Sequence, residues 1–351
     1  MTKHYGILIF LVIMASSLVA CNEDGTAIKP TAEILEEPIS TTSSYPGPAE
    51  SGYPGPAGDN GYPAPQQPTK LPSVQLGEAR FPGKLAFHSE QAGAGFQVYL
   101  FDGQDGTVTP ITGGVTQGYE PTWARDCRTL IYSQQTGATI VDLYRTSLDT
   151  YEALPFFKMM KDDTLDWSAV WSPQGDRVAY QTNLDAKINI CLADASGADL
   201  GCLERQGYDN ANPAFSPDGE ELIFVSNRDG DWEIYVTGAD GSGNVRQLTD
   251  NNYSDRNPEF SPDGRFIIFD SDAAATYDIY RMQADGTEVT RLTELIESER
   301  EPEWIGNDLI VFSSNEDGDH DLYLMSSEGK NLRQITDYIG KDGGATWCPT
   351  E

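Results

Sequence analysis

Residues 213–230 read PAFSPDGEELIFVSNRDG, a pattern that recurs along the chain and sets its architecture. It contains an aromatic anchor at Phe215, a Ser-Pro-Asp-Gly turn at residues 216–219 and a β-branched, aromatic run at residues 222–226. Proline presets φ for a tight turn and glycine accepts a positive φ, so two strands should meet at this turn. The run is short and bounded by turn residues, which favours a strand over a helix.

The pattern returns six times between residues 84 and 351. Its anchors are separated by 48, 44, 45, 44 and 43 residues and are Trp123, Trp171, Phe215, Phe260, Trp304 and Trp347. A second aromatic series keeps the same step, at Phe87, Tyr132, Tyr180, Phe224, Phe269 and Phe312. This period is typical of four-stranded propeller blades. In the repeat of Phe215 the four strands are expected at residues 213–215, 222–226, 233–235 and 246–249.

The two ends of the array are incomplete in complementary ways. The first repeat begins at a second strand, residues 84–89, and the last segment, residues 345–348, is a first strand with nothing after it. Together they complete one blade and leave no open sheet edge. The sequence therefore predicts an all-β, six-bladed β-propeller that is closed by pairing of its N- and C-terminal segments.

The repeat resembles the WD40-like propeller repeat of the TolB family. The resemblance rests on Ser-Pro-Asp-Gly at 216–219, on residues 223–230, on Glu233-Ile234-Tyr235 and on Gln247-Leu248-Thr249, and it covers about residues 81–351. It departs in the first two repeats, where Ala124-Arg125-Asp126-Cys127 replaces the turn and residues 156–166 are an insertion. The resemblance implies a six-bladed fold and an extracytoplasmic setting, and it makes a TolB-like role in envelope assembly one alternative function.

The N-terminal part indicates export and a membrane anchor. An apolar run at residues 7–15 is a signal-peptide core, and Leu18-Val19-Ala20-Cys21 resembles a bacterial lipobox whose cysteine is acylated. We expect a signal peptide at 1–20, a lipid-anchored, disordered Pro/Gly/Tyr-rich linker at 21–80 and the propeller at 81–351. The alternative at Cys21 is an ordinary cleaved signal followed by a chance cysteine.

Charge restricts the partners. The formal net charge is −32, which argues against nucleic acid because phosphate contacts need a basic face. Anionic headgroups would repel the domain, so only the lipid anchor should hold it to a bilayer. Basic proteins, divalent cations and neutral glycans stay possible as ligands, solubility alone is the simpler interpretation, and we expect a monomer.

Four cysteines remain after Cys21. Cys191 and Cys202 should face each other in one hairpin, and Cys127 and Cys348 fall on blades that ring closure makes adjacent. An oxidising compartment permits both disulfides, and free buried thiols are the alternative.

One face of the propeller should carry the function, namely the face with the connections between blades and the hairpins between second and third strands. Exposed aromatic rings among charged residues suit stacking on sugars or anchoring a peptide, although the same rings could pack against the next blade. The candidate binding residues are Tyr119, Trp167, Tyr208, Tyr253, Arg256, Arg300 and Tyr338.

Two acidic hairpins place oxygen ligands at every second position, as calcium loops do. Glycine stands at the fourth position, however, and Asp-Gly is also a common hairpin turn. The candidate ligands are Asn227, Asp229, Asp231 and Glu233 in one hairpin and Asn315, Asp317, Asp319 and Asp321 in the other. No other cofactor is predicted.

Enzyme motifs are scarce. After signal cleavage only His88 and His320 remain, which argues against a multi-histidine metal site, and no Gly-x-Ser-x-Gly elbow occurs. No catalytic residue can be assigned. The sequence favours a module that binds an envelope or extracellular protein or a glycan, and the alternative is a carboxylate-based glycoside hydrolase or lyase on the propeller face.

Overall fold

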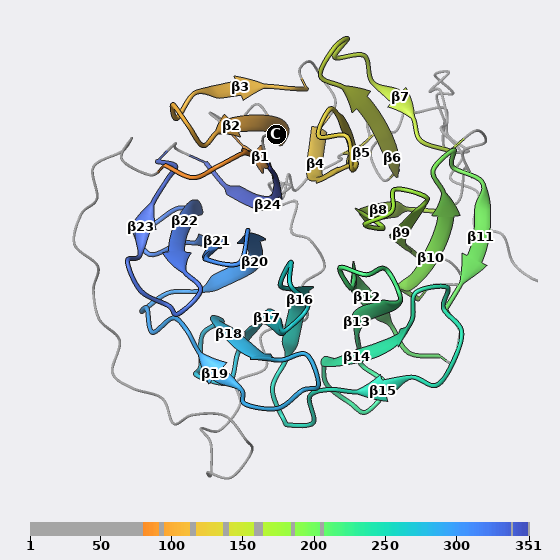
Figure 1. Cartoon of the computed structure of the whole chain (residues 1–351), viewed down its shortest axis with the longest axis vertical. Coiled ribbons are helices and arrows are strands. Elements are labelled where there is room, and N and C mark those ends of the chain that lie inside the picture. The colour runs from red at the N-terminus through yellow and green to blue at the C-terminus, as the bar shows by residue number, and fades with distance from the viewer. Residues whose placement is uncertain are drawn as a thin grey trace, which may run out of the picture. The chain divides into compact units, whose positions relative to one another are not determined.

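The computed structural model describes residues 80–90, 95–112, 117–135, 140–157, 164–183, 187–203, 207–337 and 340–349. The predicted signal peptide, Cys21, the linker and Tyr338 lie outside the described residues. Within them, six four-stranded antiparallel sheets are arranged around a central axis (Figure 1). The predicted all-β, six-bladed propeller is confirmed.

Blades 1 to 5 follow the chain from the inner to the outer strand. Blade 1 is β4 (Gln117–Trp123), β5 (Thr129–Gln135), β6 (Val141–Ser147) and β7 (Leu154–Pro155). Blade 2 is β8 (Asp166–Trp171), β9 (Arg177–Thr182), β10 (Asn189–Asp194) and β11 (Asp199–Cys202). Blade 3 is β12 (Asn210–Phe215), β13 (Glu221–Ser226), β14 (Glu233–Gly238) and β15 (Arg246–Gln247). Blade 4 is β16 (Asp255–Phe260), β17 (Phe266–Ser271), β18 (Asp278–Gln283) and β19 (Thr290–Arg291). Blade 5 is β20 (Glu299–Ile305), β21 (Leu309–Ser314), β22 (Asp321–Ser326) and β23 (Arg333–Gln334).

Blade 6 joins the two ends of the repeat array. β24 (Asp342–Cys348) is its inner strand and pairs antiparallel with β1 (Lys84–Ser89), with Lys84 opposite Cys348; β2 (Gln97–Asp102) and β3 (Val108–Pro110) complete the sheet. The indole N–H of Trp347 also donates to the carbonyl of Pro82, at 2.7 Å. The predicted closure is confirmed, and it pairs the edge of β1 that would otherwise be open.

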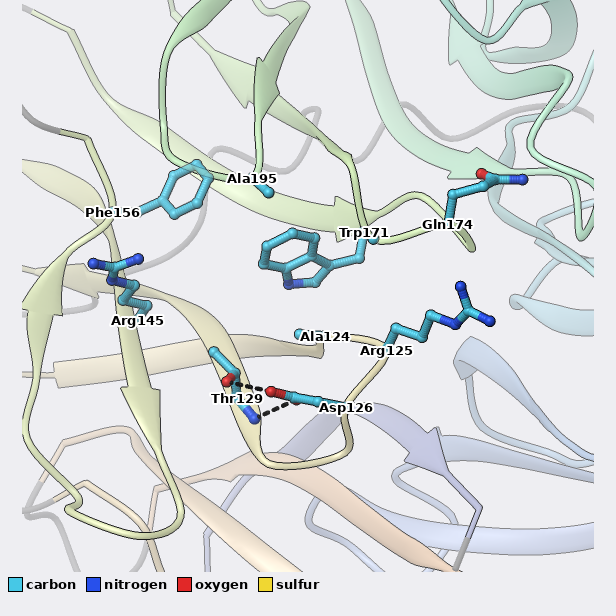
Figure 2. Close-up of a pocket in the computed structure, with 10 residues that line it drawn as sticks. Ala124, Arg125, Asp126, Thr129, Arg145, Phe156, Trp171, Gln174 and Ala195 are labelled. Carbon is cyan, nitrogen blue, oxygen red and sulfur yellow. Dashed lines mark hydrogen bonds between the residues drawn. The ribbon is translucent and has the colours of Figure 1, made fainter. Parts of the chain in front are cut away.

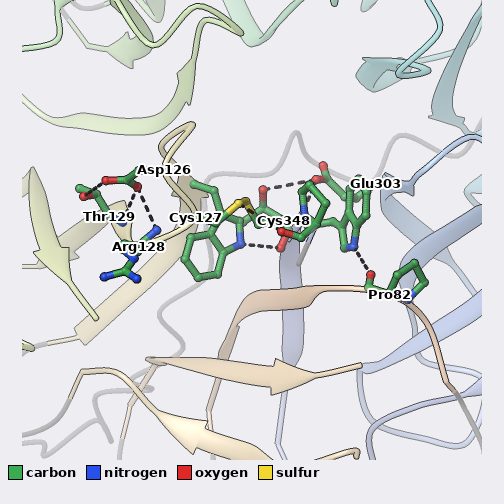
Figure 3. Close-up of a disulfide and its surroundings, with 11 residues drawn as sticks. Pro82, Asp126, Cys127, Arg128, Thr129, Glu303 and Cys348 are labelled. Atoms are coloured by element: carbon green, nitrogen blue, oxygen red, sulfur yellow. Dashed lines mark hydrogen bonds between the residues drawn. A yellow bond between two sulfur atoms is a disulfide. The ribbon is translucent and has the colours of Figure 1, made fainter. Parts of the chain in front are cut away.

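Both candidate cysteine pairs are bonded in the structure. Cys127 and Cys348 join blade 1 to blade 6 across the closure (Figure 3), with Cα atoms 5.8 Å apart. Cys191 and Cys202 lie directly opposite each other in β10 and β11, with Cα atoms 3.8 Å apart. The first bond therefore ties together the two ends of the propeller, and the second fastens a single hairpin.

The turn after each inner strand follows the chemistry of its residues. In blade 3 Gly219 adopts a φ of 72°, and its N–H donates to the carbonyl of Ser216. The hydroxyl of Ser216 accepts the N–H of Glu221 at 2.9 Å and donates to Asp218 at 2.6 Å. The Ser-Pro-Asp-Gly pattern is thus a self-contained hairpin that starts the second strand.

The core lies between neighbouring blades. The second aromatic series is buried, and three of its members stack on a tyrosine of the third strand, with ring centroids 5.7 to 6.0 Å apart. Each fully buried ring of this kind stabilises the fold by roughly 1.5–3 kcal/mol. The aromatic residues of this second series are therefore structural.

Candidate functional site

Every inner strand carries a β-bulge at the same place. The pairing register shifts there in all six blades, and one residue per strand has a left-handed φ between 47° and 54°. These six residues, the bulge ring, line the central channel. They are Glu120, Ser168, Asn212, Asn257, Glu301 and Gly344. For a residue with a Cβ this conformation costs about 1–2 kcal/mol, and such strain collects where function demands a backbone shape.

Hydrogen bonds between blades hold the bulge ring in place. The carboxylate of Glu120 accepts the N–H of Ser168 at 3.1 Å, and that of Glu301 accepts the N–H of Gly344 at 2.7 Å. Asp270 accepts the N–H of Glu301 at 3.0 Å. In each case an acid of one blade binds the backbone of the next, so the carboxylates are oriented before any ligand arrives.

Two further acids lie deeper in the channel. Glu259 accepts the N–H of Trp304 at 2.9 Å, and Glu303 accepts that of Trp347 at 2.8 Å. The two carboxyl groups also hydrogen-bond to each other, so one of them must carry a proton. Burial raises the pKa of Glu303 to about 7, and burial with the neighbouring Glu303 raises that of Glu259 well above its usual range.

The channel is therefore narrow and acidic. Its cavity has a volume of about 180 Å³, and its lining includes the four carboxyl groups of Glu120, Glu259, Glu301 and Glu303. Among the described residues that line it, none is Lys, Arg or His. A cationic group of suitable size would find opposite charge here with little competing positive charge.

The two histidines of the propeller both lie beside Glu301 at the channel mouth. Burial lowers the pKa of His88 and of His320, and the charge of Glu301 opposes the shift in each case. A Cβ on Gly344 would lie 2.7 Å from His88 Nδ1, so this glycine leaves room for the imidazole. Nothing in the sequence indicates that these two histidines, 232 positions apart, lie at one site.

Two predicted arginines border the mouth, and both are stacked on aromatic rings. The guanidinium of Arg256 lies 4.5 Å from the centroid of Trp232, and that of Arg300 lies 3.7 Å from the centroid of Tyr277. Each immediately precedes a residue of the bulge ring. Stacking fixes the guanidinium planes and leaves the channel lining itself acidic.

The predicted aromatic residues are less exposed than a stacking surface requires. Tyr119 and Trp167 occupy the position before the bulge ring and are half-buried. Arg228 covers Tyr208, with its guanidinium 4.6 Å from the ring centroid, and Tyr253 packs against the core between blades 3 and 4. These rings support the mouth from the side. The residues that sequence reasoning missed are the bulge ring and the pair of Glu259 and Glu303.

The second acidic hairpin gathers three carboxylates. Ligand oxygens of Asp317, Asp319 and Asp321 lie within 4.8 Å of one another, and this is the one such group among the described residues. Gln334 donates its amide to Asp317 at 2.7 Å and to Asp321 at 3.1 Å. Burial, with Asp317 and other acids nearby, raises the pKa of Asp321 to about 8. Calcium binding at this hairpin remains a prediction.

The first acidic hairpin is arranged differently. Asp229 accepts a hydrogen bond from the hydroxyl of Tyr235, and the buried Glu233 accepts the backbone N–H of Asn251. Glu233 begins β14, where it helps to join the third strand to the connection that follows β15. Its carboxylate has a structural role that the hairpin pattern did not reveal.

Comparison with known proteins identifies the repeat. Residues 155–309 match the family model of the TolB beta propeller domain. In this segment, which is less than half of the chain, the repeat is similar to that of TolB. No curated protein sequence matches the chain.

Solved structures share the fold of this TolB-type propeller. TolB from Acinetobacter baumannii has a TM-score of 0.65 at 19% identity, over 76% of this chain and 67% of that one. A putative TolB from Agrobacterium tumefaciens has a TM-score of 0.60 at 20% identity, over 76% of this chain and 99% of that one. Hydrazine synthase from Kuenenia stuttgartiensis has a TM-score of 0.62 at 13% identity, over 76% of this chain and 46% of that one. At these identities the likeness concerns the fold alone.

No helix among the described residues has the length and apolar character to cross a membrane.

Proposed function

We propose that this TolB-type propeller is an extracytoplasmic protein-binding module whose channel mouth receives a basic segment of its partner. The observation that supports this most is the acidic channel, with four carboxyl groups and no basic residue among its described lining. A lysine or arginine side chain entering the channel would meet Glu301 first and the pair of Glu259 and Glu303 below it. The positive charge would replace the proton that this pair must otherwise hold.

The rigidity of the site supports the same function. Strained backbone and carboxylates bound to the next blade mean that the acids are ordered in advance, so little conformational entropy is lost on binding. The net charge of −32 would also attract a basic partner over a longer range. The proposal thus covers both association rate and the final contact.

We further propose that acylated Cys21 tethers the module to a membrane. Two disulfides fit an oxidising, extracytoplasmic compartment. A role in envelope assembly, like that suggested by the TolB resemblance, is one form that such protein binding could take.

A carboxylate glycosidase is the alternative function. Glycoside hydrolases hold their two carboxyl groups about 5 Å or more apart, to leave room for a nucleophilic attack or a water. Glu259 and Glu303 are in direct hydrogen-bond contact, and they do not offer that separation. The channel geometry therefore favours binding over this chemistry.

The experiment compares two charge-matched variants of the full-length chain. Glu301→Gln with Glu303→Gln removes two channel charges and keeps both backbone acceptors, and Glu220→Gln with Glu152→Gln removes two exposed charges elsewhere. Immobilised protein is exposed to extracytoplasmic extract at low and moderate salt. We expect the channel variant alone to lose its captured partner. Equal loss in both variants, or none in either, would contradict a channel site.

A further inference from the structure

A second pocket lies on the opposite face, between blades 1 and 2. It has a volume of about 350 Å³ and is formed by the turn at 124–129, by β6 and by the turns after β8 and β10 (Figure 2). Its polar lining includes Arg125, Arg145 and Gln174, and its apolar lining includes Phe156 and Trp171. The volume is at the small end of the range for ligand sites and suits a single ring.

This pocket occurs where the repeat departs from its own pattern. Ala124-Arg125-Asp126-Cys127 replaces the Ser-Pro-Asp-Gly turn of the later blades, and the insertion after β7 begins at Phe156. Phe156 is buried and packs edge-on against Trp171, with ring centroids 6.3 Å apart. The two departures thus build one concavity between blades 1 and 2.

Trp171 differs from the other tryptophan anchors. The indole N–H groups of Trp123 and Trp347 donate to backbone carbonyls at 3.1 and 2.7 Å, and Trp304 is enclosed in the core at 2% exposure. Trp171 is partly exposed and lines the pocket, and its Nε1, like that of Trp304, is buried without a hydrogen-bond partner among the described residues. Because this nitrogen is buried, a ligand in the pocket would contact the indole ring rather than its N–H.

The pocket is positively charged on a strongly acidic protein. Arg125 and Arg145 flank Trp171 from opposite sides (Figure 2), and within the described residues neither guanidinium hydrogen-bonds or pairs with a carboxylate. Asp126, the acid of the pocket, accepts the N–H groups of Arg128 and Thr129 in its own turn, at 2.9 and 2.8 Å. Among the described residues, no acid therefore competes with an anion for these two arginines.

The wall that carries Arg125 is held rigidly. Cys127, two residues further on, is bonded to Cys348 of blade 6. On the other side Gln174 donates to the carbonyl of Asp218 in blade 3, at 2.5 Å. A site fixed on both sides binds a small ligand without ordering its own loops.

We propose that this pocket binds a small ring compound that bears a carboxylate, either a uronic acid unit or an aromatic acid. The ring fills the space beside Trp171 and Phe156, and a guanidinium group at one end of the pocket, that of Arg125 or that of Arg145, binds the carboxylate. The site is independent of the channel and of the protein partner proposed above.

The test uses the full-length chain labelled with ¹⁵N and follows its indole N–H signals by NMR. Trp171→Phe identifies the signal of Trp171 by its disappearance. Glucuronate and benzoate are the probes, at concentrations up to ~10 mM because single-ring ligands bind weakly. Glucose and benzyl alcohol are the neutral controls for each ring.

We expect one or both acids, and neither neutral compound, to shift the Trp171 signal. A response to glucuronate alone assigns the site to saccharide acids, and a response to benzoate alone assigns it to aromatic acids. The Gln variant of the arginine that binds the carboxylate, either Arg125→Gln or Arg145→Gln, should weaken binding about tenfold, the effect of losing one charge-assisted hydrogen bond. Arg128→Gln is the matched control, because Arg128 is exposed on the same turn and pairs with Asp149 outside the pocket.

The proposal is overturned if neither acid shifts the Trp171 signal, or if the neutral compounds shift it equally. It is also overturned if neither Arg125→Gln nor Arg145→Gln weakens binding more than Arg128→Gln does. The arginine variants concern exposed side chains, and an unchanged unfolding temperature shows that they still fold.

Discussion

The disulfide across the closure should contribute more to stability than the disulfide within the hairpin. Cys127 and Cys348 are separated by 221 positions, and Cys191 and Cys202 by 11. A cross-link stabilises mainly by restricting the unfolded chain, and the effect grows with the logarithm of the loop. For these two loops the chain-entropy relation gives about 5 kcal/mol and about 3 kcal/mol at 25 °C.

Serine pairs test this difference without leaving a free thiol. We expect Cys127→Ser with Cys348→Ser to lower the free energy of unfolding by about 2 kcal/mol more than Cys191→Ser with Cys202→Ser does. The measurement is urea unfolding of the full-length chain without reductant, with the slope and midpoint fitted for each variant.

The reasoning would be refuted if the hairpin variant lost as much stability as the closure variant. A closure variant that unfolds like the wild type would refute it too. Because a propeller of this size has a total stability of roughly 5–15 kcal/mol, a loss of this magnitude is easily measured.

Three further predictions concern pH, the anchor and calcium. Burial raises the pKa of Glu233 to about 8 and that of Glu299 to about 9, whereas both side chains ionise near pH 4 in the unfolded chain. Between these pH values the folded state holds more protons than the unfolded state, so the unfolding temperature should fall as pH rises from 5 to 9. A rise in unfolding temperature over this range would contradict the raised pKa values of the two buried acids. Cys21→Ser should move the protein from the membrane fraction to the soluble one, and mass spectrometry of the wild type should find Cys21 acylated; an unmodified mature start elsewhere would remove the anchor. If the second acidic hairpin binds calcium, the ion at a hundredfold excess over Kd should raise the free energy of unfolding by about 2.7 kcal/mol, and Asp317→Asn with Asp319→Asn should abolish that gain. Identical melting curves in calcium and in EDTA would show that no ion binds.

The fold was predictable because its signal repeats. One aromatic anchor proves little, but six at nearly equal spacing leave one architecture, and the split blade follows from where the first and last strands fall. The cysteine pairs followed from the same register, since Cys191 and Cys202 are cross-strand neighbours once the hairpin is accepted. Local pattern and global arrangement agree at these positions.

The channel site was not predictable, for a physical reason. Glu120 and Glu301 adopt a left-handed backbone that their residue type does not favour, so propensity points away from the bulge. A proline follows both of them, two positions before a tryptophan anchor, but it favours extended backbone in the preceding residue and so does not indicate the left-handed bulge either. Contact between Glu259 and Glu303 depends on the packing of two blades and has no local signature.

The aromatic residues of the connecting face also depend on packing that the sequence does not reveal. Tyr208 and Tyr253 stand in polar connections, which suggested exposure, but Arg228 covers the first and a core cluster holds the second. Their sequence position places them on the mouth face of the propeller, as expected. Only the packing shows that these rings support the mouth.

Site-specific photo-crosslinking in cells tests the proposed channel mouth most directly. Ile296 lies on a connection between blades at the mouth face and Val245 on a turn of the opposite face, and they are similarly exposed, at 47% and 43%. Each is replaced in turn by a photoreactive phenylalanine derivative in the full-length chain. The account predicts a discrete crosslinked protein from position 296, lost with Glu301→Gln and Glu303→Gln, and none from position 245. A partner crosslinked from position 245 but not from 296 would contradict it.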